Sequence, residues 1–198
     1  MFYISKPSRS EIESFLTVNK RADLSYPFIG ESERGFRPSR KRPGTKKYNI
    51  DHNRIILGQG DEDWRKAIAA VKAWKMFDMP WVEICWPDMP ISEDETVAIL
   101  IHHFGFYSLN AAKIVYTIDK LNSFGFAYGT LADHGESGEE RFTVDMDSKT
   151  GEIWYDLYSF SRPNQLFARI GYPLTRMLQK QLAADSKSAM LRATQTIG

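Results

Sequence analysis

The sequence has little of what marks secreted, membrane-spanning or strongly charged proteins. It contains one cysteine, Cys85, so it cannot form an internal disulfide. Its longest strongly apolar run, residues 97–101, is far shorter than the ~20 residues that span a bilayer. The N-terminus lacks the basic start and apolar run of a secretory signal, and the formal net charge is only +1. We therefore expect a cytoplasmic protein with no overall charge that favours nucleic acid or an anionic membrane.

The bulk composition is that of a globular chain. It has 198 residues, of which 42% are hydrophobic and 26% charged, which is enough for a sizeable core. Cys85 lies between Ile84 and Trp86. We interpret it as a small core residue of a strand rather than as a nucleophile.

The N-terminal part of the chain shows little regular periodicity. Residues 8–18 fit a short helix that Ser8 or Ser10 caps. Residues 19–48 contain prolines and glycines without an apolar period, which predicts an irregular arm. We therefore divide the chain into an N-terminal helix and basic arm, residues 1–48, and a folded domain, residues 49–198.

From residue 49 onward the apolar pattern changes between strand and helical periods. Residues 61–77 predict an amphipathic helix with acidic residues in its first turn and lysines in its last. Apolar and alternating runs predict seven strands, mostly with short connections, and thus an antiparallel meander. The predicted strands are residues 50–58, 81–86, 95–104, 111–119, 124–131, 138–147 and 152–160.

The C-terminal segment predicts one long amphipathic helix that begins at Pro163. Pro173 is expected to kink or divide it, and the residues from Ala189 onward are expected to fray. Its apolar stripe consists of Leu166, Phe167, Ile170, Leu174, Met177, Leu178 and Leu182. A sheet with one face to bury needs such a helix, which predicts an α+β fold with a cavity between the two.

Several short motifs resemble a known family in their order and spacing. They are residues 26–30 (Tyr-Pro-Phe-Ile-Gly), 57–60 (Leu-Gly-Gln-Gly), 126–131 (Phe-Ala-Tyr-Gly-Thr-Leu), 138–142 (Gly-Glu-Glu-Arg-Phe) and 160–163 (Phe-Ser-Arg-Pro), with Trp64, Ala67, Trp74, Trp81 and His134. With these motifs the chain is similar to an uncharacterised bacterial and plant branch of the START-like (SRPBCC) superfamily, a domain of unknown function. This superfamily has the helix-grip fold of the birch pollen allergen, polyketide cyclases and lipid-transfer domains.

The resemblance implies a curved antiparallel sheet of about seven strands around a long C-terminal helix. It also implies a hydrophobic cavity that binds an apolar or amphipathic small molecule. It implies no reaction, because members of one fold differ in function.

Glu140 is the first candidate for chemistry. It shares a predicted strand face with Phe142 and Val144, which are expected to point inward. A carboxylate on an apolar face is costly without a partner, and its pKa is expected to rise. Glu140 then serves as a general base or anchors a ligand hydroxyl or amine. The alternative is a structural pair with an arginine such as Arg162 or Arg169.

The histidines give weaker signals. His134 lies in a predicted turn, where it is either a proton carrier at the cavity rim or a side chain bonded to backbone. His102 and His103 are adjacent in a strand and face opposite sides, so they cannot bind one metal together. A site that joins one of them to His134 or Glu140 lacks the spacing of metal ligands. We expect neither a metal nor a cofactor.

The expected ligand contacts combine strand residues with two residues of the last helix. Aromatic residues at period two either line a cavity or form ordinary sheet core, and tyrosine hydroxyls supply polar contacts in the first case. The expected contacts are Tyr116, Phe126, Tyr128, Glu140, Tyr155, Tyr158, Leu174 and Met177.

The arm carries a run of cations without an acid. The run consists of Arg34, Arg37, Arg40, Lys41, Arg42, Lys46 and Lys47, whereas the rest of the chain holds 19 basic and 25 acidic residues. The run either binds phosphate, RNA or an anionic membrane, folds back onto an acidic face, or is a solvated basic loop. The last is the commonest outcome for such a segment.

The sequence therefore favours a module that binds an apolar or amphipathic small molecule. One alternative is a cofactor-independent enzyme of cyclase, isomerase or hydrolase type that uses Glu140 or His134 as acid or base. The other is an adaptor for nucleic acid or membrane through residues 34–47. The residues identify neither the ligand, nor a reaction, nor the oligomeric state.

Overall fold

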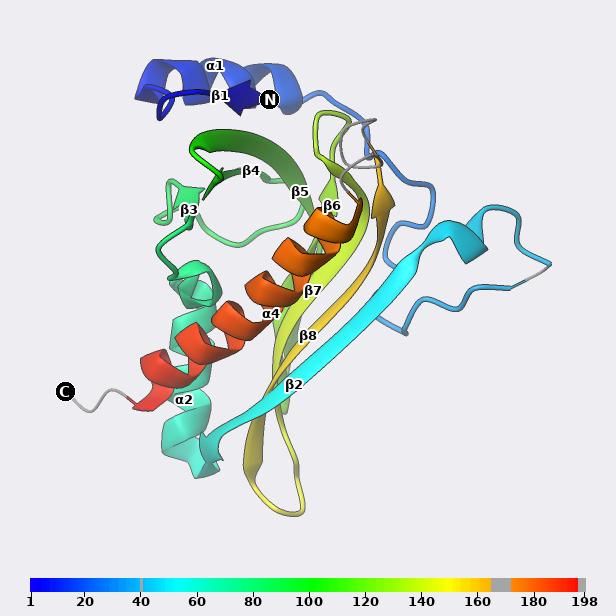
Figure 1. Ribbon diagram of the computed structural model, residues 1–198. Coiled ribbons are helices and arrows are strands. Elements are labelled where there is room, and N and C mark those ends of the chain that lie inside the picture. The colour runs from blue at the N-terminus through cyan, green and yellow to red at the C-terminus, as the bar shows by residue number, and fades with distance from the viewer. Residues whose placement is uncertain (40, 165–171, 196–198) are drawn as a thin grey trace.

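One antiparallel sheet runs through the molecule (Figure 1). The computed structural model describes residues 1–39, 41–164 and 172–195. Within them eight strands form the sheet in the order β2, β8, β7, β6, β5, β4, β3, with β1 paired to β5. The strands are β1 (Phe2–Tyr3), β2 (Asn49–Gln59), β3 (Val82–Cys85), β4 (Thr96–His103), β5 (Phe106–Lys120), β6 (Ser123–Thr130), β7 (Glu136–Met146) and β8 (Glu152–Pro163). Consecutive strands from β3 to β8 are neighbours, which confirms the predicted meander.

The helices connect and cover this sheet. They are α1 (Arg9–Asn19), α2 (Gly60–Lys72) and α4 (Tyr172–Gln195), with the 3-10 turns η1 (Thr45–Lys47) and η2 (Lys75–Phe77). Because β2 and β3 lie at opposite ends of the strand order, α2 and η2 carry the chain between them. No helix in the described part of the chain is long and apolar enough to cross a membrane.

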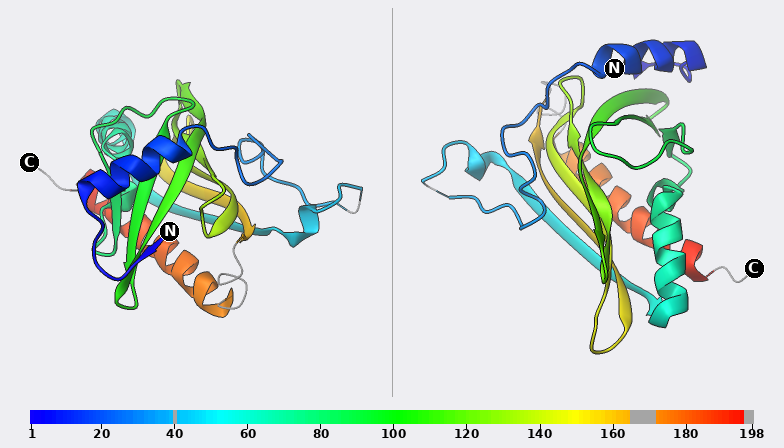
Figure 2. Two further views of the ribbon diagram at one scale, coloured as in Figure 1. Left: turned by 90° about the horizontal axis from the view of Figure 1, so that it is seen from above. Right: turned by 180° about the vertical axis from the view of Figure 1, so that it is seen from behind.

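The concave face of the sheet holds the main core. α2 and α4 lie on this side (Figures 1 and 2), where they pack on the inward-pointing residues of the strands. Phe126, Phe142 and Tyr155 are fully buried there, and Cys85 is buried in a smaller cluster under α1. A curved antiparallel sheet that holds a long C-terminal helix is the predicted helix-grip architecture.

The N-terminal segments cover other parts of the sheet. Phe36 stacks on Phe160 of β8 with ring centroids 4.3 Å apart. The buried carboxylate of Glu139 accepts hydrogen bonds from Tyr26 Oη at 2.7 Å, Gly30 N at 2.7 Å and Ser32 N at 2.9 Å. The arm is therefore attached to the convex face, opposite the side that α4 covers.

Two expectations for the C-terminal segment are wrong. Pro163 ends β8 rather than beginning a helix. Pro173 is the second residue of α4, and the kink or division expected there involves residues 165–171, which lie outside the described residues. The helix does not fray from Ala189, because it continues to Gln195 with Ala189 2% and Met190 0% exposed. The predicted stripe residues Leu166, Phe167 and Ile170 lie outside the described residues.

Candidate functional site

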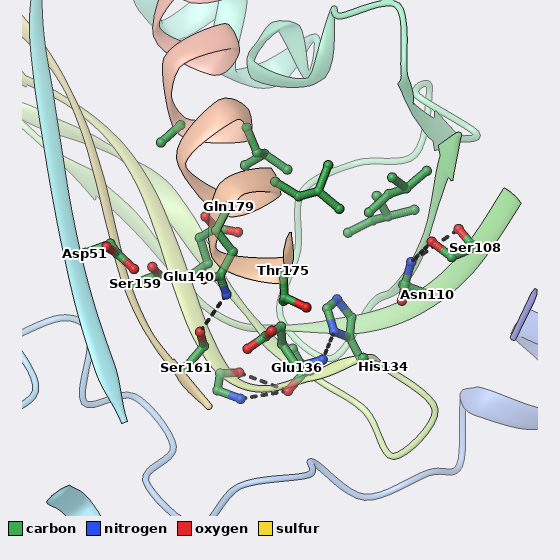
Figure 3. A pocket seen from close by; sticks show the side chains of 18 of the residues that line it. Asp51, Ser108, Asn110, His134, Glu136, Glu140, Ser159, Ser161, Thr175 and Gln179 are labelled. Carbon is green, nitrogen blue, oxygen red and sulfur yellow. Dashed lines mark hydrogen bonds between the residues drawn. The ribbon is translucent and has the colours of Figure 1, made fainter. Parts of the chain in front are cut away.

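A cavity of about 780 Å³ lies between the concave face of the sheet and the first half of α4 (Figure 3). This volume is typical of small-molecule sites. Leu174 and Phe104 line the cavity and are 42% and 57% exposed, so the cavity reaches the surface. Its apolar wall includes Phe77, Trp81, Ile99, Ile101, Leu157, Leu178 and Leu182.

Two glutamates of β7 face this cavity. Glu136 and Glu140 are four residues apart and share one face of the strand. Figure 3 shows both on the side of the sheet that faces Gln179 and Thr175 of α4. Glu140 accepts a hydrogen bond from Tyr128 Oη at 2.6 Å. The carboxylate oxygens of Glu136 are buried and have no hydrogen-bond partner among the described residues.

Burial raises the pKa of both glutamates to about 7. For Glu140 the hydrogen bond from Tyr128 opposes this rise, whereas the negative charges of Asp51 and Glu136 add to it. For Glu136 nearby polar side chains and the Arg176 guanidinium oppose it. Both carboxyl groups therefore change charge near neutral pH, where acid–base chemistry and ligand binding take place.

An ion pair joins α4 to β2 beside these acids. Two Arg176 nitrogens lie 2.6 and 2.7 Å from the Asp51 carboxylate oxygens, which is a bidentate arrangement. Arg176 also donates to Gln179 Oε1 at 2.6 Å, and Gln179 Nε2 donates to Ser161 Oγ at 3.1 Å. The Asp51 carboxylate thus engages the charge of Arg176, and no ion pair joins Glu136 to another residue in the part of the chain that the structure describes.

His134 lies at the same end of the cavity. Its Nδ1 accepts a hydrogen bond from the backbone N–H of Glu136 at 3.0 Å, so the proton of the neutral ring is on Nε2. Burial lowers the pKa of His134 to about 4, with the nearby terminal amino group as a further cause. At neutral pH His134 therefore offers an N–H donor rather than a base. The backbone contact is the one that the turn interpretation predicts.

The cavity wall contains some of the expected ligand contacts but not others. Tyr128, Glu140 and Leu174 line the cavity. Phe126 and Tyr155 lie on the same sheet face but are buried core residues outside the cavity wall. The Tyr155 hydroxyl lies 2.8 Å from Ser186 Oγ of α4.

The remaining expected contacts lie away from the cavity. A β-bulge between Ile114 and Tyr116 shifts the register of β5, which places Tyr116 on the convex face, where its hydroxyl lies 2.6 Å from Ser32 Oγ. Tyr158 faces the arm and donates to the Phe36 carbonyl at 3.4 Å. Met177 is 49% exposed on α4 and does not line the cavity.

Sequence reasoning missed several polar residues of the cavity. The sequence contained one signal for Glu136, which is four residues before Glu140 and therefore falls on the same face of a strand. It was missed because the predicted strand began only at Gly138. Ser159 and Ser161 also alternate with the buried Phe160 on β8. Further missed polar residues include Asp51, Ser108, Asn110, Thr175 and Gln179.

The structural alternatives for the candidate residues have mixed outcomes. Arg162 forms no ion pair with Glu140, since its guanidinium lies over the Tyr48 ring at 5.0 Å; Arg169 lies outside the described residues. His103 lines the cavity, and His102 stacks on Tyr107 at 4.4 Å. Among residues 1–39, 41–164 and 172–195, no group of three histidines, cysteines or acids is placed to hold a metal ion.

The described members of the basic run differ in their surroundings. Arg42 forms an ion pair with Glu31 and lies 5.1 Å from the Phe28 ring centroid. The other described members are exposed: Arg34, Arg37, Lys41 and Lys47. Arg40 and the side chain of Lys46 lie outside the described part. Contact of this run with an anionic partner remains a prediction.

Comparisons with known proteins place the chain in a family. Residues 26–189 match the family model described as "Domain of unknown function (DUF1990)". A UPF0548 protein of Dictyostelium discoideum is 35% identical over 206 residues, which cover 98% of this chain and 95% of that protein. A UPF0548 protein of Deinococcus radiodurans is 31% identical over 204 residues, which cover 98% of each chain.

Solved structures share the fold at low sequence identity. The crystal structure of a hypothetical protein from Helicobacter pylori has a TM-score of 0.50 and 15% identity, covering 80% of this chain and 96% of that chain. The di-domain ARO/CYC BexL from the BE-7585A biosynthetic pathway has a TM-score of 0.51 and 9% identity, covering 77% of this chain and 52% of that one. These likenesses confirm the predicted helix-grip fold.

Proposed function

The chain belongs to the DUF1990 family, and we propose that it binds an apolar or amphipathic small molecule in the cavity between the sheet and α4. The observation that carries this proposal is the open cavity of about 780 Å³, with an apolar wall and polar groups gathered at one end. Such a space costs stability when empty, because its lining side chains forgo packing contacts. A ligand with an apolar body restores those contacts.

The polar end supports an amphipathic ligand over a purely apolar one. Tyr128, Glu140 and Ser161 reach this end from three neighbouring strands, and Gln179 reaches it from α4. Polar groups around an apolar pocket fix the orientation of a bound molecule. His134 adds an N–H donor from the turn before β7.

The direct test is native mass spectrometry of the freshly purified protein, followed by organic extraction. A stoichiometric small molecule supports the proposal. The matched variants are Ala183→Phe, which fills the cavity wall, and Ala184→Phe, which adds the same ring to an exposed neighbour on α4. We expect loss of the molecule, and of binding of the neutral dye Nile red, only in Ala183→Phe. Equal dye binding by both folded variants would contradict the proposed cavity site.

One observation favours acid–base catalysis as a second candidate function. Glu140 faces the cavity with a pKa of about 7, which is the range of an efficient general base at neutral pH. His134 is held as a donor, so it suits a role in orienting the substrate rather than as the base.

The catalytic candidate is tested with the compound extracted from the protein. Glu140→Gln keeps a hydrogen-bond acceptor for Tyr128 but cannot take a proton. We expect this variant to keep binding the compound and to lose its conversion. A compound that the unaltered protein leaves unchanged over extended incubation, under conditions where it binds, would speak against catalysis on that compound.

A further inference from the structure

The cavity contains two acids, Glu136 and Glu140, that form no ion pair within the described residues, although the Arg176 guanidinium opposes the rise in the pKa of Glu136. Both oxygens of the Glu136 carboxylate are buried, and neither has a hydrogen-bond partner in residues 1–39, 41–164 and 172–195. Glu140 receives one hydrogen bond, from the neutral hydroxyl of Tyr128 at 2.6 Å. Within the described residues no lysine or arginine forms an ion pair with either glutamate. A buried carboxylate without such a partner is costly, so its retention here needs a physical reason.

The other charged groups around this end do not neutralise the pair. On β2 and α4, Asp51 and Arg176 engage each other through a bidentate ion pair. Lys180 of α4 is exposed. The turn before β7 adds Asp133, and the terminal amino group nearby donates to the Leu109 carbonyl at 2.9 Å. Three histidines line the cavity. Burial lowers the pKa values of His103 and His134, which are neutral at pH 7, and His52 Nε2 lies 2.6 Å from the Asp156 carboxylate.

We propose that the ligand is an amphipathic amine, whose protonated nitrogen lies between Glu136 and Glu140 and whose apolar part fills the cavity toward Trp81 and Leu182. This inference rests on the proposed binding function and specifies the ligand class. An ammonium group offers up to three N–H donors, which matches the unused acceptors of the two carboxylates. Fatty acids and phosphate esters are disfavoured, because their anionic heads would add negative charge to this end.

The placement of the acceptors fits such a head group. Both glutamates project from one face of β7, and Ser159 and Ser161 project from the same face of the adjacent strand β8. Figure 3 shows Glu136, Glu140, Ser159 and Ser161 on the sheet side of the cavity, with Gln179 facing them from α4. Two neighbouring strands thus present carboxylate and hydroxyl oxygens on one face of the sheet, toward the cavity.

The ionisation of the glutamates gives the proposal a pH signature. In the empty cavity both carboxyl groups lose their protons only near pH 7. An ammonium ligand favours the charged carboxylates, so its binding below pH 7 must expel protons. Affinity for an amine is therefore expected to increase from pH 5.5 to pH 8, whereas affinity for a neutral alcohol of the same length is not.

The experiment compares decylamine, decanol and decanoate, with binding followed by the fluorescence of the cavity residue Trp81 and by titration calorimetry. At pH 8 we expect decylamine to bind at least about tenfold more tightly than decanol, and decanoate to bind weakest. The preference for decylamine should shrink at pH 5.5. Calorimetry in buffers of different ionisation enthalpy should show proton release when decylamine binds at pH 6.

Charge variants locate the effect. Glu136→Gln and Glu140→Gln should each reduce the preference for decylamine over decanol, and the double variant should abolish it while decanol still binds. Glu62→Gln, which removes an exposed charge on α2, should leave the preference unchanged. Equal affinity of decylamine and decanol for the unaltered protein would overturn the amine inference and leave the proposed binding function intact. Absence of binding by all three probes would instead contradict the proposed binding function itself.

Discussion

Replacement of Glu140 by glutamine should raise the free energy of unfolding above that of the unaltered chain, and this gain should be larger at pH 8 than at pH 5. Folding raises the pKa of this carboxyl from 4.5 to about 7, chiefly through burial. Between these values the folded protein holds a proton that the unfolded chain has lost. The free energy of unfolding therefore falls as the pH rises through this window, and the loss is complete above pH 7. Glutamine has no such penalty.

The magnitude follows from the size of the shift. The shift from 4.5 to about 7 is about 2.5 pKa units, which at about 1.4 kcal/mol each give an upper bound of roughly 3.5 kcal/mol. Water that enters the open cavity solvates part of the charge, so we expect a gain of about 1–3 kcal/mol for Glu140→Gln at pH 8. Because Glu136 and Asp51 repel the charge on Glu140, the variant also relieves those groups.

The assay is urea unfolding at pH 5, 6, 7 and 8, with the difference between variant and unaltered protein plotted against pH. The difference should rise from pH 5 to pH 7 and then level off. In a protein that keeps Glu140, Tyr128→Phe should extend the pH-dependent loss of stability to higher pH, because it removes the hydrogen bond that lowers the pKa of that carboxyl. Glu62→Gln should show no rise, since the pKa of this exposed residue is lowered by Lys66. A pH-independent difference for Glu140→Gln would refute the account of a desolvated carboxyl.

Three further predictions concern stability. Glu139→Gln should cost about 2–4 kcal/mol in urea unfolding and speed proteolysis of the arm, because a buried carboxylate with several donors loses its charge; unchanged values would show that the arm does not depend on it. Met190→Ala should cost about 2–5 kcal/mol, whereas the exposed Ser188→Ala should cost little. Equal small effects would mean that the end of α4 is not packed. Tyr155→Phe should cost about 1 kcal/mol through its lost bond to Ser186, and a stability gain would contradict that bond.

The order of elements in the fold was predictable, because strand and helix periods dominate this sequence. The ends of the last elements were not. A proline is compatible both with the end of a strand and with the first turn of a helix. Only the pairing of β8 with β7 assigns Pro163 to the strand. The end of α4 is rich in small residues, so its apolar pattern is weak. Its burial depends on contact with α2 and η2, which local sequence does not specify.

The candidate site was predictable only where strand parity was undisturbed. Glu140 was identified because it alternates correctly with Phe142 along β7. Tyr116 was misplaced by a bulge, which reverses the facing of every later residue and leaves no clear signal in a single sequence. Met177 was assigned to the inward stripe of a helix whose rotation about its axis is set by packing on the sheet. The cavity itself depends on the distance between α4 and the strands.

Glu139 and Glu140 are adjacent in β7 but lie on opposite faces of the strand, and the two faces treat a carboxylate differently. On the convex face, Glu139 is fully served by donors from the arm, including two backbone N–H groups. On the concave face, the residues that the structure describes give Glu140 one neutral donor and Glu136 none. The fold thus satisfies a buried carboxylate where it serves structure, yet leaves two of them under-satisfied where a cavity meets the surface. Because that arrangement lowers the stability of the empty protein, a bound molecule that supplies the missing donors is the physical account that fits both faces.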